Sequence, residues 1–367
     1  MPIFFVAGTG QHQGKTTTTL GLAANLQAQG FNVGYCKPIG QKHVEVNGKM
    51  ADKDCVLFEK LLDFELDPQY HSPVILASGV TKQYLYDPSG FNFKEDILRA
   101  ANHLQSIHDI VIFEGTGHVG VGSVVDLSNA EVAKVLGSRA ILVVEGGVGN
   151  TLDQITLNLA LFEKAGVPIH GVIINKVKQE KMEEIQAVLG PRLERLGIPV
   201  LGYIPYDPTL SYPILYTVQD AIRGRCLLHP EGLLNKVQDY LAGSLIDIDL
   251  VDHLDGILLV VNPHRFKESL ELMIEKSREL ELERVPIAGI VVTGDGRDGS
   301  QYSPDEFDHP YILDNRIPIL ATRYETYDAV VMISRIEVKI NTNTQWKVNR
   351  AIELFKNHIP IEQFMDV

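Results

Sequence analysis

The chain has 367 residues, which is longer than one ordinary domain and predicts about two. Its 45% hydrophobic and 22% charged residues are typical of a globular protein with buried cores and argue against a disordered chain. A formal net charge of −14 argues against general binding to nucleic acid or to an anionic membrane, because both need a basic face.

The cysteines and the apolar runs indicate the cellular compartment of the protein. Cys36, Cys55 and Cys226 are odd in number and lack metal-type spacing, so we expect buried thiols in a reducing compartment. The first apolar run has no basic region before it and is only as long as a strand. No later run reaches the roughly 18–20 residues of a membrane span. We therefore expect a cytoplasmic protein without a membrane partner.

In chain order, short apolar runs alternate with stretches of helical period over the first 200 residues. Strands are predicted at 3–7, 32–36, 110–113, 140–144 and 171–174, and helices at 16–28, 129–136, 152–165 and 181–196. Strands that are apolar on both faces belong to parallel sheets with helices on each side. This pattern predicts a doubly wound α/β domain.

A segment rich in Pro, Tyr and Gly, 202–213, separates this domain from a second alternation. Strands are expected there at 257–261, 288–292 and 317–321, and helices at 268–280 and 343–355. The predicted domains are 1–210 and a smaller α/β domain over 211–360.

The sequence GTGQHQGKTTTT follows the first predicted strand and precedes the first helix, the context of a phosphate-binding P-loop. Its backbone N–H groups would surround phosphate, Lys15 would bridge the outer phosphates, and Thr16 would take a magnesium position. The loop is one residue longer than the commonest form. The predicted nucleotide-binding residues are Gly8, Thr9, Gly10, Gln11, His12, Gln13, Gly14, Lys15, Thr16 and Thr17.

Two acids are candidate metal ligands with Thr16. Glu114 ends the predicted strand 110–113 and meets the turn 115–117, so its carboxylate would lie at the edge where parallel sheets bind ligands. Magnesium prefers one or two carboxylates with phosphate and water oxygens, which Glu114 and Asp54 would supply. A role at a helix N-terminus is equally natural for Asp54, because Asp52 is two residues away.

The longer loop resembles that of the dethiobiotin synthetase and cobyrinate amidotransferase clan. The segment CKPIGQ, residues 36–41, resembles the Lys-Pro segment of that clan. Segments 111–137, 145–155 and 171–177 resemble more closely the dethiobiotin-synthetase-like domain at the N-terminus of long bacterial phosphotransacetylases. This resemblance covers residues 1–210.

Several expected roles follow from the resemblance. It implies that Asp54 binds magnesium, that Lys37 holds substrate and phosphate and acts with Lys15 in catalysis, and that Asn175 and Pro205 lie at the adenine edge. The tentative substrate residues, besides Lys37, are Gly115, Thr116, Gly117 and His118. His12 stands where the synthetase has an acid, and either a chemical role or an ordinary loop position suits both His12 and His118.

The C-terminal part resembles a second module of the same phosphotransacetylases, the DRTGG domain. VVNPHRFKESL, GIVVTGDG and RIPILATRYETYDAV look like its strand ends, with His264-Arg265 in place of Asp-Arg and Thr293-Gly294-Asp295 in place of Thr-Gly-Gly. The chain ends at Val367, where the acyltransferase domain would begin. We therefore expect no phosphotransacetylase activity.

The sequence favours a magnesium-dependent protein that binds and hydrolyses ATP and has a regulatory or sensing role in carbon metabolism. The alternative is an ATP-dependent ligase or kinase that phosphorylates a small carboxylate or carbamate. A small carboxylate ligand, a protein partner and a symmetric homo-oligomer are further expectations. Residues 8–13 contain no Lys, which argues against the ATP-sandwich dimer of partitioning ATPases.

Overall fold

The computed structural model describes residues 2–242, 254–282, 285–297 and 299–365. These residues form two compact units, one made of residues up to Asp207 together with those from Ile340 onward, and one of Pro208–Lys339. The boundary after Asp207 falls inside segment 202–213, which the sequence predicts to separate the two domains. The second domain was predicted to run to residue 360, whereas the structure returns the chain to the first unit at Ile340. The reason is a C-terminal helix that packs on the first unit.

A six-stranded parallel sheet is the centre of the first unit. Its order is β10-β9-β8-β1-β7-β2, so the strand that precedes the phosphate-type loop, β1, lies between β7 and β8. Parallel strands place all their carboxyl ends at one edge, which is where this fold binds ligands. The strands are β1 (Ile3–Gly8), β2 (Val33–Cys36), β7 (Ile110–His118), β8 (Arg139–Glu145), β9 (Ile169–Val177) and β10 (Val200–Pro205).

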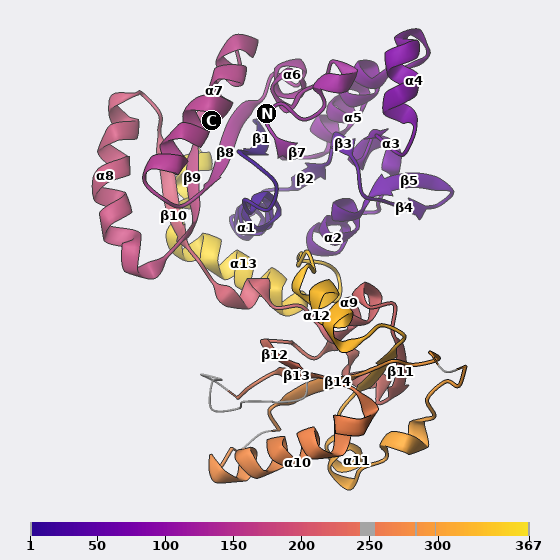
Figure 1. The fold of residues 1–367 in the computed structure, drawn as a ribbon. Helices are drawn as coiled ribbons and strands as arrows, with labels where there is room; N and C mark the ends of the chain where they lie inside the picture. The colour runs from indigo at the N-terminus through magenta and orange to yellow at the C-terminus, as the bar shows by residue number, and fades with distance from the viewer. Residues whose placement is uncertain (1, 243–253, 283–284, 298, 366–367) are drawn as a thin grey trace. The chain divides into compact units, whose positions relative to one another are not determined.

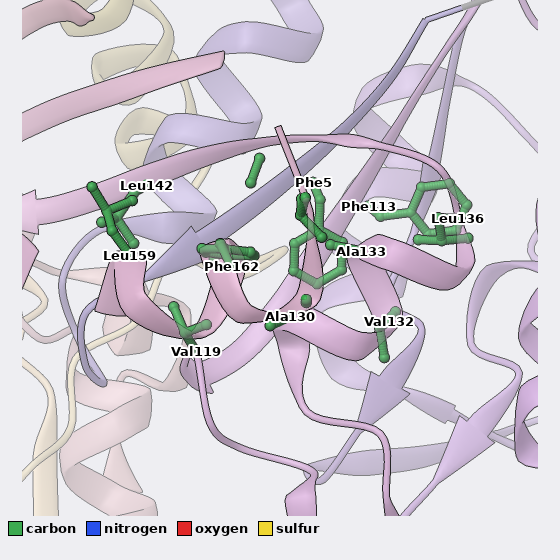
Figure 2. Packing of buried hydrophobic residues seen from close by; sticks show 14 of the residues in the cluster. Phe5, Phe113, Val119, Ala130, Val132, Ala133, Leu136, Leu142, Leu159 and Phe162 are labelled. Carbon is green, nitrogen blue, oxygen red and sulfur yellow. The ribbon is translucent and has the colours of Figure 1, made fainter. Parts of the chain in front are cut away.

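One face of this sheet is covered by four helices with amphipathic or apolar inner surfaces. They are α5 (Phe93–Ile107), α6 (Asn129–Val135), α7 (Gly149–Ala165) and α8 (Met182–Arg195). Phe5 and Phe113 from neighbouring strands pack against Ala130 and Ala133 of α6 and Phe162 of α7 (Figure 2). These side chains are at most 2% exposed, and burying a Phe contributes about 1.5–3 kcal/mol to folding.

Helices α1 (Lys15–Ala28) and α13 (Gln345–His358) lie together on the other face (Figure 1). Gly21 of α1 permits the close approach, because a Cβ there would lie 2.2 Å from the Cβ of Phe355. Beyond α13 the short 3₁₀ helix η8 (Ile361–Phe364) places the ring of Phe364 edge-on to Phe4 of β1, with centroids 5.6 Å apart. The C-terminal segment thus completes the core of the first unit.

Between β2 and β7 the chain makes an insertion that the sequence patterns did not predict. A hairpin of β4 (His43–Val46) and β5 (Lys49–Asp52) leads into helix α2 (Lys53–Leu62). The insertion also contains β3 (Ile39–Gly40), β6 (Val74–Ile75), α3 (Pro68–His71) and α4 (Val80–Tyr86). Apart from the ten-residue α2, these elements are too short for periodicity to distinguish from loops.

The second unit is a smaller five-stranded sheet of order β11-β15-β14-β13-β12, in which β11 alone is antiparallel to its neighbour. Its strands are β11 (Arg225–Leu228), β12 (Asp239–Ala242), β13 (Ile257–Val261), β14 (Ile287–Thr293) and β15 (Ile319–Thr322). Its helices are α9 (Leu215–Ala221), α10 (Pro263–Glu279), α11 (Pro310–Asn315) and α12 (Thr326–Ser334). Among the helices that the structure describes, none combines the length and apolar character needed to cross a membrane.

Gly21→Ala tests whether α13 is an integral part of the first unit. The added methyl group has no room beside Phe355, and overpacking outweighs the better helix propensity of Ala. We expect the free energy of unfolding to fall by about 1–2 kcal/mol. Urea unfolding followed by the fluorescence of Trp346, the only tryptophan and a residue of α13, measures the change. Gly149→Ala is the control, because its Cβ would meet no atom within 4 Å, and equal effects of the two substitutions would refute the packing role.

Candidate functional site

The loop between β1 and α1 is held in one conformation by Gly14 and Asn175. Gly14 has φ 94°, a left-handed conformation that favours glycine, and a Cβ there would lie 1.9 Å from Nδ2 of Asn175. The buried Asn175 donates from Nδ2 to the Gln13 carbonyl oxygen at 2.9 Å. His12 also adopts a positive φ, 59°. The carboxyl end of β9 therefore anchors the loop directly before α1.

Lys15 lies across this loop. Its Nζ donates to the carbonyl oxygen of Gly10 at 2.8 Å, and its side chain passes so close to Gly8 that a Cβ there would lie 3.0 Å from Lys15 Nζ. Lys15 is 8% exposed. Because the first turn of a helix has N–H groups without intrahelical partners, the loop brings an ammonium group and backbone donors to one place. Such a combination suits a phosphate group.

Four polar side chains meet beside the loop, and we call Thr16, Lys37, Asp54 and Glu114 the carboxylate cluster. Thr16 Oγ1 donates to Glu114 Oε1 at 2.8 Å. Lys37 Nζ contacts Asp54 Oδ2 at 2.8 Å and Glu114 Oε1 at 3.0 Å. The structure thus brings together the three predicted metal ligands and the predicted phosphate-binding Lys37.

Glu114 reaches the cluster from within a strand and not from its end. The sequence predicted a strand that stops at 113 and a turn at 115–117, whereas β7 continues to His118. The pairing of β1 with β7 is irregular here, because Val6 lies opposite Glu114, whereas Gly8, two residues later, lies opposite His118, four residues after Glu114. Asn129 of α6 contacts these extra residues, donating from Nδ2 to the carbonyl oxygens of Thr116 and His118 at 2.9 and 2.7 Å. Glu114 therefore lies within a strand that is tied to α6 just beyond it.

The sequence allowed Asp54 either to bind a metal or to cap a helix, and in the structure the cap is Asp52. Asp52 caps α2, with Oδ1 accepting from the Asp54 N–H at 3.0 Å. This leaves the Asp54 carboxylate to face Lys37. The hairpin of β4 and β5 and the first turn of α2 thus supply the acid at the cluster.

The electrostatics of the cluster depend on its burial. Burial alone would lower the pKa of Lys37, but Asp54 and Glu114 raise it above its ordinary value, so Lys37 carries a charge. Burial, followed by the neighbouring Asp54, raises the pKa of Asp52. Sequence reasoning missed Tyr35, a fully buried residue of β2 whose hydroxyl donates to Glu114 Oε2 at 3.4 Å. An apolar strand pattern gives no signal for such a contact.

The remaining predicted residues occupy the same end of the sheet in different settings. Thr116 Oγ1 donates to the Ile39 carbonyl oxygen at 2.6 Å, and Gly117 has φ 65°. His118 is exposed at the end of β7, where its Nδ1 accepts from the Gly120 N–H at 3.1 Å. Pro205 ends β10 beside Val177, two residues beyond Asn175 on the neighbouring strand. The substrate role of residues 115–118 stays a prediction.

The donor set fits a magnesium nucleotide. Within the described ranges no group of three or more His, Cys, Asp and Glu side chains forms a ready cage for a metal. The cluster offers two carboxylates and a hydroxyl, which suits Mg²⁺ because this ion completes its shell with phosphate oxygens and water. Lys15 and the loop donors adjoin these ligand oxygens, because Thr16, the residue after Lys15, is hydrogen-bonded to Glu114.

Comparison with known proteins assigns the family. Residues 3–213 match the family model described as an AAA domain. The chain belongs to this family. The matched region contains the loop and all four residues of the carboxylate cluster, so they form part of a P-loop domain.

Some relatives of this chain are named phosphate acetyltransferases, and others are named dethiobiotin synthetases. Phosphate acetyltransferases of Nitrosomonas europaea and Synechocystis sp. are 25% and 26% identical over 98% and 99% of this chain. The chain spans about half the length of these proteins, 50% and 51%. An ATP-dependent dethiobiotin synthetase of Methanocaldococcus jannaschii is 30% identical over 47% of this chain and 79% of its own length.

Among solved structures, the septum site-determining protein MinD of Pyrococcus horikoshii, complexed with Mg-ADP, is 19% identical. The match covers 57% of this chain and 83% of the other, with a TM-score of 0.36.

Two of the three free cysteines flank the cluster in sequence, and we predict that they are unreactive. Cys36 and Cys55 are fully buried, and burial raises the pKa of both thiols. Cys226 is partly exposed. Because the thiolate is the reacting form, a disulfide reagent at pH 8 should modify one thiol faster than the other two by about tenfold or more. Cys226→Ser should remove the fast phase, and a fast phase that persists in this variant would contradict the burial of Cys36 and Cys55.

Proposed function

We propose that the first unit binds ATP with Mg²⁺ and hydrolyses it, and that occupancy of this site regulates a step of carbon metabolism. The observation that carries the proposal is the continuous contact from the loop to the carboxylate cluster. Thr16, the residue after Lys15, is hydrogen-bonded to Glu114, which also holds Lys37. The groups proposed to bind phosphate and metal are thus adjacent, and Lys15, Lys37 and Glu114 among them are buried.

Each residue has a defined task in this proposal. Lys15 and the N–H groups at the start of α1 would bind the outer phosphates. Thr16, Asp54 and Glu114 would hold Mg²⁺, which neutralises charge on the phosphates when it is bound. Lys37 would stabilise charge on the transferred phosphoryl group. Asn175 and Pro205, at the carboxyl ends of β9 and β10, would border the base.

The regulatory part of the proposal is supported by the relatives that match nearly the whole chain, since these are named phosphate acetyltransferases. We propose that Pro208–Lys339, the DRTGG-like unit, passes nucleotide occupancy to a protein partner. We also propose that this chain forms a homo-oligomer and works in the cytoplasm.

A second candidate is an ATP-dependent ligase or kinase for a small carboxylate or carbamate. One observation favours it: a dethiobiotin synthetase of Bacillus subtilis subsp. natto matches over 99% of its own length at 27% identity. The chain also retains both lysines and both acids of the site, more than a simple nucleotide binder requires. Residues 115–118 would then contact the second substrate.

Steady-state phosphate release from MgATP tests the proposal, with and without a small-molecule cell extract. Lys15→Ala should lower the release rate by about a hundredfold or more, because the loop loses its only ammonium group. Lys53→Gln, which changes an exposed lysine beside Asp54, is the matched control and should leave the rate unchanged.

The extract separates the two candidates. A slow rate that extract does not change supports the regulatory role. A rate that rises severalfold with extract, and only when Lys15 is intact, supports the ligase or kinase. Equal rates in Lys15→Ala and the unmodified protein would contradict both candidates.

A further inference from the structure

We propose that Lys37 is an internal counter-ion that occupies the place of the divalent cation until nucleotide arrives, and that the ammonium group and the metal ion exchange on binding. This inference rests on the proposed function, because it concerns the same site. It adds a property that the binding roles do not require: metal and nucleotide must each raise the affinity of the site for the other.

The contacts of Lys37 carry the proposal. Its Nζ lies 2.8 Å from Asp54 Oδ2 and 3.0 Å from Glu114 Oε1, so one ammonium group bridges both candidate metal ligands. Thr16 Oγ1 donates to the same Glu114 Oε1 at 2.8 Å. Every side chain that would hold Mg²⁺ is therefore already joined to Lys37, directly or through Glu114.

Burial makes this bridge necessary. The side chains of Lys37 and Glu114 are 5% and 1% exposed, and that of Asp54 is 15% exposed. Two carboxylates removed from water need a compensating cation, and removal of the cation leaves an uncompensated buried charge. In the described structure, Lys37 supplies one such cation to both carboxylates. A divalent cation would satisfy this need equally well.

Two cations bound to the same pair of carboxylates repel each other, so the ammonium group and Mg²⁺ compete for this site. Mg²⁺ requires short, direct contacts with its carboxylate ligands, and the ammonium group already contacts one oxygen of each. The exchange needs only side-chain motion, since the backbone N–H of Lys37 donates to the carbonyl oxygen of His71 at 2.8 Å, independently of the cluster. A lysine stem with four rotatable carbons can move its ammonium group to a nearby phosphate.

The exchange predicts a thermodynamic coupling. Without nucleotide, metal binding must displace Lys37 from Asp54 and Glu114 with no phosphate to receive it. With nucleotide, phosphate oxygens receive Lys37 while they also ligate the metal. Coupling of this kind is reciprocal, so metal must raise nucleotide affinity by the same factor.

Direct Mn²⁺ binding to the nucleotide-free full chain is the first test, measured by the paramagnetic resonance of free Mn²⁺. Lys37→Gln removes the competing charge and should raise Mn²⁺ affinity by about tenfold or more over the unmodified protein. Lys37→Arg keeps the charge and should bind Mn²⁺ as weakly as the unmodified protein. Lys53→Gln, which removes an exposed charge next to Asp54, controls for a general increase in negative charge.

The outcomes separate this proposal from the proposed function. Unchanged Mn²⁺ affinity in folded Lys37→Gln would overturn the exchange, even if nucleotide binds and is hydrolysed. Absence of nucleotide binding to the unmodified protein would overturn the proposed function instead, whatever the Mn²⁺ affinity of the variants. Far-UV circular dichroism establishes that each variant is folded.

A crystal structure of the unmodified protein with Mg²⁺ and a non-hydrolysable ATP analogue provides a test that needs no variant. We expect Lys37 Nζ to lie beyond hydrogen-bond distance from both Asp54 and Glu114 and to contact a phosphate oxygen. Retention of both ion pairs beside bound metal would overturn the proposal.

Discussion

The ammonium group of Lys37 contacts the carboxylates of both Asp54 and Glu114, whose side chains are 15% and 1% exposed. The elements that carry these three residues must be placed accurately, because a buried charge without a partner costs several kcal/mol. Glu114 lies in a strand that Asn129 ties to α6, and Asp54 lies in the first turn of a helix that Asp52 caps. Lys37 follows β2 directly, beside β7 in the sheet. The site is therefore a consequence of how the sheet and the insertion fit together.

The same constraint joins the metal-binding side of the site to the phosphate-binding side. Thr16 is the second residue of α1 and bonds to Glu114, so the start of α1 cannot move without disturbing the cluster. Asn175 ties the loop to β9 from the opposite side. At the other face of the sheet, α13 packs on α1, and Gly21, which has no side chain, permits the close approach of the two helices. The C-terminal segment thereby supports the helix on which the phosphate-binding loop is built.

Sequence patterns predicted the parts of this arrangement that depend on local periodicity and loop chemistry. The parallel strands, the loop before α1 and the doubly wound first domain are as expected, since apolar runs and a Gly-Lys-Thr segment determine them locally. The continuation of β7 to His118 could not be read from the sequence, because it depends on a side chain of Asn129 that is distant in sequence. The return of α13 to the first unit and the contact of Tyr35 with Glu114 are likewise long-range packing effects. Residue types that are common in turns, such as Gly115 and Gly117, favoured a turn where the tertiary structure imposes a strand.

Calorimetric titration of the full-length chain with ATP, in the presence and absence of Mg²⁺, shows whether the loop and the carboxylate cluster bind nucleotide and metal together. We expect saturable binding of one nucleotide per chain that is strong with Mg²⁺ and much weaker without it, because Lys37 would otherwise remain on the two carboxylates. Absence of binding heat with Mg²⁺ up to millimolar ATP would contradict the assignment of the loop as a nucleotide site. Binding of equal strength with and without Mg²⁺ would contradict the role given to the carboxylate cluster.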